Sequence, residues 1–187
     1  MDDHVCPPWV GRLLLSPLRR LVESPKKILG PFVLKGMTVL EPGCAMGFFC
    51  LPQARMDGPD GKVFAVDIQS EMLAVLEKRA RRAGLIDRLD IREAGPETLG
   101  IDDLGRSADF CSLIHVAHEV PDQPRLFGEI SRTLKPGGKL LLIEPGWHVS
   151  EEEFRESLAA ASSAGLRKTK STDLQGGRKA LFERQGS

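Results

Sequence analysis

A glycine-containing turn follows the first predicted strand and could hold a ligand at the edge of a sheet. The turn reads Glu41-Pro-Gly43-Cys-Ala45-Met-Gly47, and a helical stretch comes after it. Glycine lets the backbone bend tightly and approach a ligand closely. Ligands of α/β folds bind at the carboxyl ends of the strands, where this turn would lie. An acid two positions before the first glycine suits a cationic ligand better than a pyrophosphate, which favours a bare helix N-terminus.

A second acid stands at the end of the next predicted strand. Asp67 closes the run 62–67 and comes 20 residues after Gly47. An acid at this place accepts hydrogen bonds from the two hydroxyls of a ribose. The glycine spacing is G-x-x-x-G, so the G-x-G-x-x-G fingerprint of nicotinamide dinucleotide binding is absent. A nicotinamide-dependent oxidoreductase is therefore an alternative that this turn does not favour.

Histidines follow the fourth and fifth predicted strands, where a general base could meet a substrate. His115 and His118 come just after the fourth strand, and His148 comes after the fifth. Histidine is the usual base near neutral pH, and an acceptor hydroxyl, amine or thiol would need one. We take His118 as the first candidate for a catalytic base and His115 as the second. Each could instead be a solvent-facing or cap-forming side chain.

The elements that position these residues alternate between short β-rich runs and amphipathic helical stretches. This alternation predicts an α/β fold with a mostly parallel sheet covered by helices. The last two strands flank Gly176-Gly177 with no room for a helix, so they predict an antiparallel hairpin. Ser150 and Glu153 form a predicted capping box for the last helix. The predicted strands are 37–41, 62–67, 89–93, 108–114, 139–144, 166–172 and 179–184, and the predicted helices are 46–56, 70–83, 123–134 and about 150–164.

The N-terminal stretch differs from the rest of the chain. Prolines at positions 7, 8, 17, 25 and 31 divide it into short predicted helices. Residues 1–36 are too few for an independent domain, so we expect a helical lid or brace on a domain formed by residues 37–187. Trp9 would anchor this lid or line a pocket.

Composition excludes several classes of protein. The chain has 187 residues, 41% of them hydrophobic and 28% charged, with 26 basic and 26 acidic side chains. These values are typical of a globular domain and not of a disordered or fibrous protein. Overall neutrality and few aromatic residues argue against nucleic acid as a partner. No run reaches the roughly 18 apolar residues of a membrane span. Four scattered cysteines without ligand spacing predict no metal site and a reduced, cytoplasmic protein.

The neutral total conceals an uneven charge distribution. Residues 1–36 carry six basic and three acidic side chains, and residues 166–187 carry six and two. The middle of the chain therefore holds 14 basic and 21 acidic residues, a net charge of −7. If the basic ends border a substrate pocket, the acceptor would be anionic. The sequence does not indicate the oligomeric state.

Four ordered motifs together resemble the class I S-adenosylmethionine-dependent methyltransferase family. They are the 41–47 turn, Val63-Phe-Ala-Val-Asp67, the fourth strand with its continuation to Asp122, and Leu134-Lys-Pro-Gly-Gly-Lys-Leu-Leu-Leu-Ile-Glu144. The resemblance covers residues 37–184. It is nearest the ubiquinone/menaquinone-biosynthesis type, which has a run similar to His115-Val-Ala-His118-Glu-Val-Pro-Asp122. It implies a Rossmann-like three-layer sandwich with a seven-stranded, mostly parallel sheet and an antiparallel C-terminal hairpin.

The resemblance also implies which residues bind S-adenosylmethionine. Glu41, Gly43 and Gly47 would hold its methionine end, with Cys44 and Ala45 in the same turn. Asp67 and Ile68 would hold the ribose and the adenine edge. Leu113 and His115 would lie at the sulfonium. Two departures stand out: Ala45 replaces the middle glycine of the family, and Gly95-Pro96 stands where an acid often binds the adenine amino group, a role left to Glu93 or Glu97.

The function implied by the resemblance is methyl transfer from S-adenosylmethionine to a small-molecule acceptor. Transfer from a sulfonium is an in-line displacement, so the protein would work mainly by positioning and desolvation. The identity of the acceptor does not follow from the sequence. A protein of the same fold that binds the cofactor without catalysis is the main alternative, and a nicotinamide-dependent oxidoreductase is the second.

Overall fold

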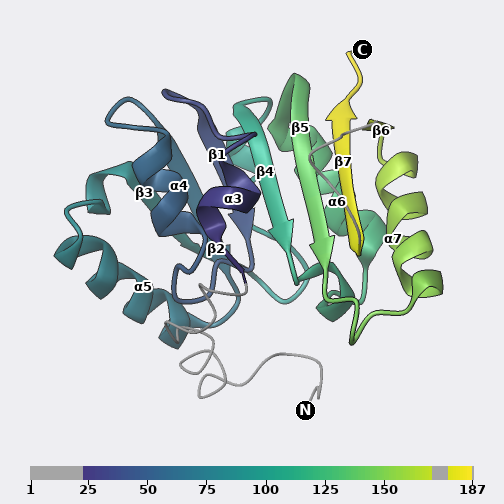
Figure 1. Cartoon of the computed structure of the whole chain (residues 1–187), viewed down its shortest axis with the longest axis horizontal. Coiled ribbons are helices and arrows are strands. Elements are labelled where there is room, and N and C mark those ends of the chain that lie inside the picture. The colour runs from purple at the N-terminus through teal and green to yellow at the C-terminus, as the bar shows by residue number, and fades with distance from the viewer. Residues whose placement is uncertain (1–22, 170–176, 187) are drawn as a thin grey trace. The chain divides into compact units, whose positions relative to one another are not determined.

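The structure is a computed structural model that describes residues 23–169 and 177–186 (Figure 1). Its described residues form two compact units, which divide between Ala94 and Gly95. The predicted role of Trp9 and the N-terminal part of the predicted lid lie outside the described residues. The assignment of residues 1–36 to a lid and 37–187 to one domain therefore stays a prediction.

The first unit is a parallel three-stranded sheet with helices, in the strand order β3-β2-β1. Thr38 pairs with Lys62 and Val63 pairs with Leu89, so the carboxyl ends of β1 and β2 lie at the same edge. This arrangement brings the turn after β1 and the last residue of β2 together. The elements are α3 (Pro25–Leu29), β1 (Thr38–Pro42), α4 (Cys50–Met56), β2 (Lys62–Asp67), α5 (Ser70–Arg82), the 3₁₀ turn η1 (Ile86–Arg88) and β3 (Leu89–Glu93).

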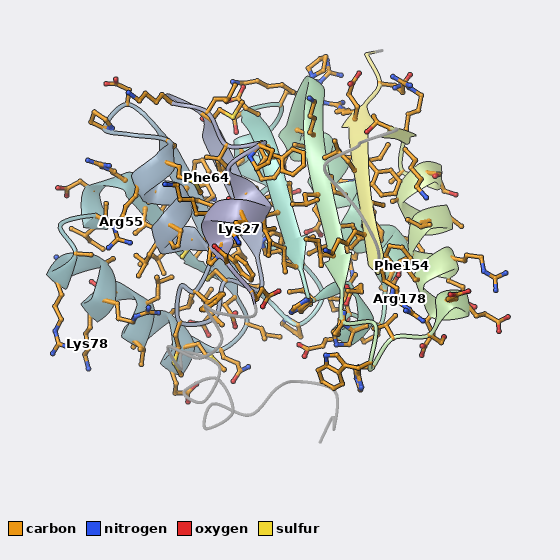
Figure 2. The ribbon with its side chains drawn as sticks, in the orientation of Figure 1. Lys27, Arg55, Phe64, Lys78, Phe154 and Arg178 are labelled. Carbon is orange, nitrogen blue, oxygen red and sulfur yellow. The ribbon has the colours of Figure 1, made fainter. Side chains whose placement is uncertain are left out.

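Helix α5 shows how the sequence period builds this unit. Met72, Leu76 and Ala80 recur every four residues, and all three side chains are buried. Lys78 lies on the opposite side, where it is exposed and extends away from the helix (Figure 2). One apolar stripe and one charged face are what an amphipathic helix needs in order to cover a sheet. Gly84 follows the helix with φ +65°, which suits a residue that ends a helix.

The second unit is a mixed four-stranded sheet in the order β4-β5-β7-β6. β4 and β5 are parallel, whereas β7 runs antiparallel to both β5 and β6, as Figure 1 shows. Phe154 lies on the side of α7 toward β7, where it is almost fully buried (Figure 2). The elements are the 3₁₀ turn η2 (Asp102–Leu104), β4 (Ala108–Ile114), the 3₁₀ turn η3 (Ala117–Glu119), α6 (Gln123–Thr133), β5 (Leu134–Glu144), α7 (Glu151–Ser163), β6 (Leu166–Thr169) and β7 (Arg178–Arg184).

Most predicted elements are confirmed, two boundaries differ by several residues, and residues 170–172 of the predicted sixth strand lie outside the described residues. The predicted helix from Met46 begins only at Cys50, because Ala45 and Gly47 have φ of +45° and +83° and no helix can include them. The strand predicted at 139–144 begins five residues earlier, at Leu134, and its pairing with β4 shifts register between Ala108 and Phe110. The antiparallel hairpin and the Ser150 capping box are both present. Within 23–169 and 177–186, no helix combines the length and apolarity that crossing a bilayer requires. The cytoplasmic location stays a prediction.

Candidate functional site

In the first unit, the turn after β1 is held by the acid at the end of β2. The backbone N–H of Ala45 donates to Asp67 Oδ2 at 2.8 Å, and the N–H of Gln69 donates to Oδ1 at 2.9 Å. The N–H of Cys44 donates to the Val66 carbonyl at 3.0 Å. The predicted cofactor residues of β1 and β2 are therefore physically joined. Both Asp67 oxygens accept backbone N–H groups, and because a carboxylate has about four acceptor positions, Asp67 could still accept a hydrogen bond from a ribose hydroxyl.

Ala45 occupies a conformation that glycine adopts more easily. Its φ is +45°, a left-handed value that costs a residue with a Cβ about 1–2 kcal/mol. The hydrogen bond from Ala45 N–H to Asp67 offsets that cost. The alanine that departs from the family pattern thus keeps the turn geometry, and the neighbouring Gly43 is exposed with φ +68°. An exposed glycine next to a strand end allows a ligand to approach the backbone.

Glu41 is buried beneath the turn. It is 4% exposed, and Gln53 Nε2 of α4 donates a hydrogen bond to its Oε2. Burial raises the pKa of Glu41 well above its usual range; a backbone hydrogen bond at Cys50 lowers it, and the charge of Asp67 raises it further. Burial also raises the pKa of Asp67, against the opposing hydrogen bonds from Gln69, Ala45 and Ile68. Two acids that are unfavourable as neighbouring anions would both gain from a bound cation.

Gly47 is required by packing within the first unit. A Cβ at this position would lie 2.5 Å from Leu76 Cδ1 and 3.2 Å from Cys50 Sγ. Cys44 and Cys50 are buried, and burial raises the pKa of both thiols, so neither is a reactive thiolate. If Cys44 contacts a cofactor, it does so through its main chain. The cofactor contact of Gly47 stays a prediction, and the packing explains why a glycine stands at this position.

The remaining predicted cofactor residues differ in their exposure. Ile68 is 45% exposed directly after Asp67, an unusual exposure for a large apolar side chain and one that a flat ligand could cover. His115 of the second unit has φ +60°, and its N–H donates to the Ile143 carbonyl at 2.7 Å. Leu113 is fully buried, so only its main chain is available to a ligand. The roles of all three residues stay predictions.

In the second unit, His118 is paired with a buried carboxylate. Its Nδ1 lies 2.5 Å from Oε2 of Glu144, the last residue of β5. The N–H of Ala117 donates to the other oxygen, Oε1, at 2.8 Å. The Glu144 side chain is completely buried, and the His118 side chain is 17% exposed. A histidine with one nitrogen on a carboxylate and a partly exposed ring is well suited to proton transfer.

Two more aromatic rings adjoin His118. The ring centroids of His118 and His148 are 5.2 Å apart with their planes at 74°, and those of His148 and Trp147 are 5.5 Å apart. Trp147 is 88% exposed. The three rings come from η3 and from the loop between β5 and α7, and we call them the aromatic cluster. The aromatic cluster thus presents flat, partly apolar ring faces next to the titratable ring nitrogens of His118.

The other predicted acids have local structural roles. Asp122 caps α6, because its Oδ1 accepts the N–H of Arg125 at 3.0 Å. Glu97 forms an exposed ion pair with Arg125 at 3.5 Å, and Glu93 is exposed at the end of β3. In the described part of the chain, no three His, Cys, Asp or Glu side chains are grouped as metal ligands would be. The role of Glu93 or Glu97 at the adenine amino group stays a prediction.

Sequence reasoning missed three residues at these sites. Glu144 ends a strand, a position from which acids reach ligands or neighbouring turns, but no spacing rule links it to His118. Gln53 lies within α4, and no local pattern points to its hydrogen bond with Glu41. Trp147 could have been noticed as a tryptophan in a short, exposed loop next to His148.

Comparison with known proteins identifies a family for more than half of the chain. Residues 40–142 match the model of a family described as a methyltransferase domain. The chain is 31% identical over 112 residues to the ubiquinone/menaquinone biosynthesis C-methyltransferase UbiE of Pasteurella multocida and 33% identical over 116 residues to the UbiE of Brucella canis. The matches cover 60% and 62% of this chain, but only 41% and 42% of the relatives. The chain thus spans about two fifths of the length of these relatives.

Solved structures show the same fold. A SAM-dependent methyltransferase from Aquifex aeolicus superposes with a TM-score of 0.81 at 24% identity, covering 96% of this chain and 97% of the other. A protein described as a putative S-adenosyl-L-methionine-dependent methyltransferase, from Methanococcus maripaludis, superposes with a TM-score of 0.75 at 17% identity, covering 100% and 98%. These matches confirm the predicted Rossmann-like α/β class, with its mostly parallel strands and antiparallel C-terminal hairpin.

Proposed function

Because the chain belongs to the class I S-adenosylmethionine-dependent methyltransferase family, we propose that it methylates a small aromatic acceptor that carries a hydroxyl group. The observation that carries the choice of acceptor is the aromatic cluster, in which Trp147 and His148 adjoin His118. The names of the UbiE relatives support the same class, because they describe C-methylation in the biosynthesis of quinones. A phenolic ring is also anionic after it loses its proton, which agrees with the anionic acceptor expected from the sequence.

The first unit has residues that fit S-adenosylmethionine. Asp67 could still accept a hydrogen bond from a ribose hydroxyl, and Ile68 is exposed beside it for the adenine edge. Glu41 and Asp67 are buried acids that a cation would stabilise in their charged forms. When bound, S-adenosylmethionine supplies a methyl group on a positively charged sulfur. Gly43, Cys44, Ala45 and Gly47 would form the turn that receives its methionine end.

His118 would act on the acceptor. Its Nε2 takes the proton of the acceptor hydroxyl, and the electrons of the broken O–H bond make the adjacent ring carbon nucleophilic. S-adenosylmethionine, held by the turn after β1 and by Asp67, would supply the methyl group to that carbon, and its sulfur would keep the electron pair of the broken carbon–sulfur bond. Loss of the ring proton at the attacked carbon then restores aromaticity. Trp147 and His148 would support the acceptor ring, since edge and face contacts between aromatic rings are worth about 0.5–1.5 kcal/mol each.

A labelled-methyl assay tests this proposal. The purified chain is incubated with methyl-labelled S-adenosylmethionine and 1,4-naphthoquinol, with 1,4-dimethoxynaphthalene as the matched acceptor that has no hydroxyl. We expect label on a ring carbon of the quinol and none on the diether. His118→Gln should lose transfer by about 10²-fold or more, while the affinity for S-adenosylmethionine changes little. Trp147→Ala should raise KM for the quinol.

Two results would contradict the proposal, and each would favour a different explanation. Tight binding of S-adenosylmethionine with no transfer to any phenol, amine or thiol would favour a non-catalytic cofactor-binding protein. Full transfer by His118→Gln would remove that residue from the chemistry and make His115 the next residue to test. Asp67→Asn distinguishes an effect on cofactor binding from an effect on acceptor choice, because it should weaken cofactor binding without changing the preference among acceptors.

A further inference from the structure

The carboxylate of Glu144 contacts two neighbouring residues of the 3₁₀ turn η3. Its Oε1 accepts the N–H of Ala117, and its Oε2 lies on Nδ1 of His118. We propose that Glu144 is a positioning residue that sets the ring orientation and the protonation of His118. This inference rests on the proposed function, because the protonation of His118 matters to catalysis only if His118 is the base.

The burial of Glu144 supports this role. A carboxylate removed from water is costly unless hydrogen bonds replace its hydration, and Glu144 is completely buried. The two donors in η3 provide that replacement. Because a carboxylate only accepts hydrogen bonds, Nδ1 of His118 must carry a proton when it faces Glu144.

The protonation state of the other ring nitrogen of His118, Nε2, follows from this contact. With the proton on Nδ1, the neutral ring has its lone pair on Nε2, which is the form that a base requires. The contact with Glu144 uses only Nδ1, so Nε2 is the nitrogen that would act on the acceptor. The ring is also held from a second direction, since His148 stacks edge to face on it. A carboxylate that orients the far nitrogen of a catalytic histidine is the arrangement found in hydrolase triads.

Charged groups around His118 act in the same direction as Glu144. Burial alone would lower the pKa of His118, but the hydrogen bond and charge of Glu144 raise it, and the charges of Glu119 on η3 and Glu153 on α7 raise it further. His148, from the loop before α7, is the other titratable group beside the ring. The net effect is a pKa above the usual value. His118 therefore becomes an unprotonated base only as the pH rises through this higher pKa, so the rate should rise over the same range.

The backbone of η3 has support that does not depend on Glu144. Gln123 Nε2 of α6 donates to the Ala117 carbonyl at 3.0 Å, and α7 packs against the turn. Replacing the Glu144 carboxylate by an amide should therefore leave the turn folded. The amide cannot replace both hydrogen bonds, because its oxygen accepts but its NH₂ group only donates. Either Ala117 N–H or His118 Nδ1–H would therefore lose its acceptor.

The test is an NMR titration of the full chain with isotope-labelled histidine, without cofactor or acceptor. Wild type is compared with Glu144→Gln and Glu144→Asp, and Glu119→Gln is the matched control that removes a neighbouring charge. We expect Glu144→Gln to lower the His118 pKa by about one unit or more and to allow both ring tautomers. Glu144→Asp should retain most of the raised pKa, and Glu119→Gln should change it only slightly.

Activity profiles against pH complete the test. In Glu144→Gln, the rise of kcat should shift to lower pH with the NMR value, and its plateau should fall by about tenfold or more. An unchanged His118 pKa or tautomer in Glu144→Gln would overturn the inference about Glu144. So would an equal loss in Glu144→Gln and Glu144→Asp without any shift of the pH profile, because that result indicates a merely structural role. Full activity of His118→Gln would instead overturn the proposed function.

Discussion

The clearest stability prediction concerns Asp57, a buried carboxylate at the end of α4. Its side chain is 0% exposed, and within the described part of the chain neither oxygen has a hydrogen-bond partner. Burial raises the pKa of Asp57 from 3.8 to about 6, although the nearby charge of Arg88 and, to a smaller extent, the backbone N–H of Asp57 itself oppose the rise. The loop that covers it is tight, since a Cβ on Gly61 would lie 2.5 Å from Asp57 Cγ.

The sign of the effect follows from proton binding. Between pH 3.8 and about 6 the folded chain holds a proton on Asp57 that the unfolded chain has lost. The protonated side chain therefore stabilises the fold fully below 3.8, and this contribution disappears as the pH rises through 6. At about 1.4 kcal/mol per pH unit, the full difference between 3.8 and 6 is about 3 kcal/mol. About 2–3 kcal/mol of it should be lost between pH 4 and pH 7.

Asp57→Asn removes this titration, and urea unfolding from pH 4 to pH 7 measures the change. The matched control is Asp60→Asn in the same loop, where the side chain is exposed. Relative to the control, Asp57→Asn should gain about 2–3 kcal/mol of unfolding free energy as the pH rises from 4 to 7. A constant difference between the two variants across this range would refute the reasoning, because it would mean that Asp57 titrates alike in the folded and unfolded chains.

Two further predictions concern positions where the local geometry determines the residue. Gly47→Ala should lower the free energy of unfolding by about 3 kcal/mol or more, because strain at φ +83° adds to the clash with Leu76. The matched control is Gly36→Ala, where φ is +77° but the space is open, and it should cost only about 1 kcal/mol. Equal losses of the two variants in urea unfolding would show that packing around Gly47 contributes nothing. Ser150→Ala should cost about 1 kcal/mol, because Ser150 Oγ accepts the N–H of Glu153 at 3.2 Å at the start of α7; an unchanged thermal midpoint would show that the capping box is not stabilising.

The candidate cofactor residues of the first unit could be predicted because they lie at strand ends. Glu41 and Asp67 close two consecutive strands, and parallel strands bring such ends to one edge by their geometry alone. The hydrogen bond from Ala45 to Asp67 realises that expectation. The left-handed φ of Ala45 could not be predicted, since alanine seldom adopts it and only the contact with Asp67 compensates for it.

By itself the sequence determined the strand and helix pattern, the turn at 41–47 and the acid at the end of β2, because these are local properties of period, turn residues and spacing. Tertiary structure alone decided that Glu144 meets His118, that Trp147 and His148 adjoin it, and that Asp57 is buried with no hydrogen bond from another described residue. These are contacts or burials set by residues distant in the chain. His118 and Glu144 are 26 positions apart. No local pattern encodes such a pair, because only the packing of β5 against the turn after β4 determines which side chains share a buried volume.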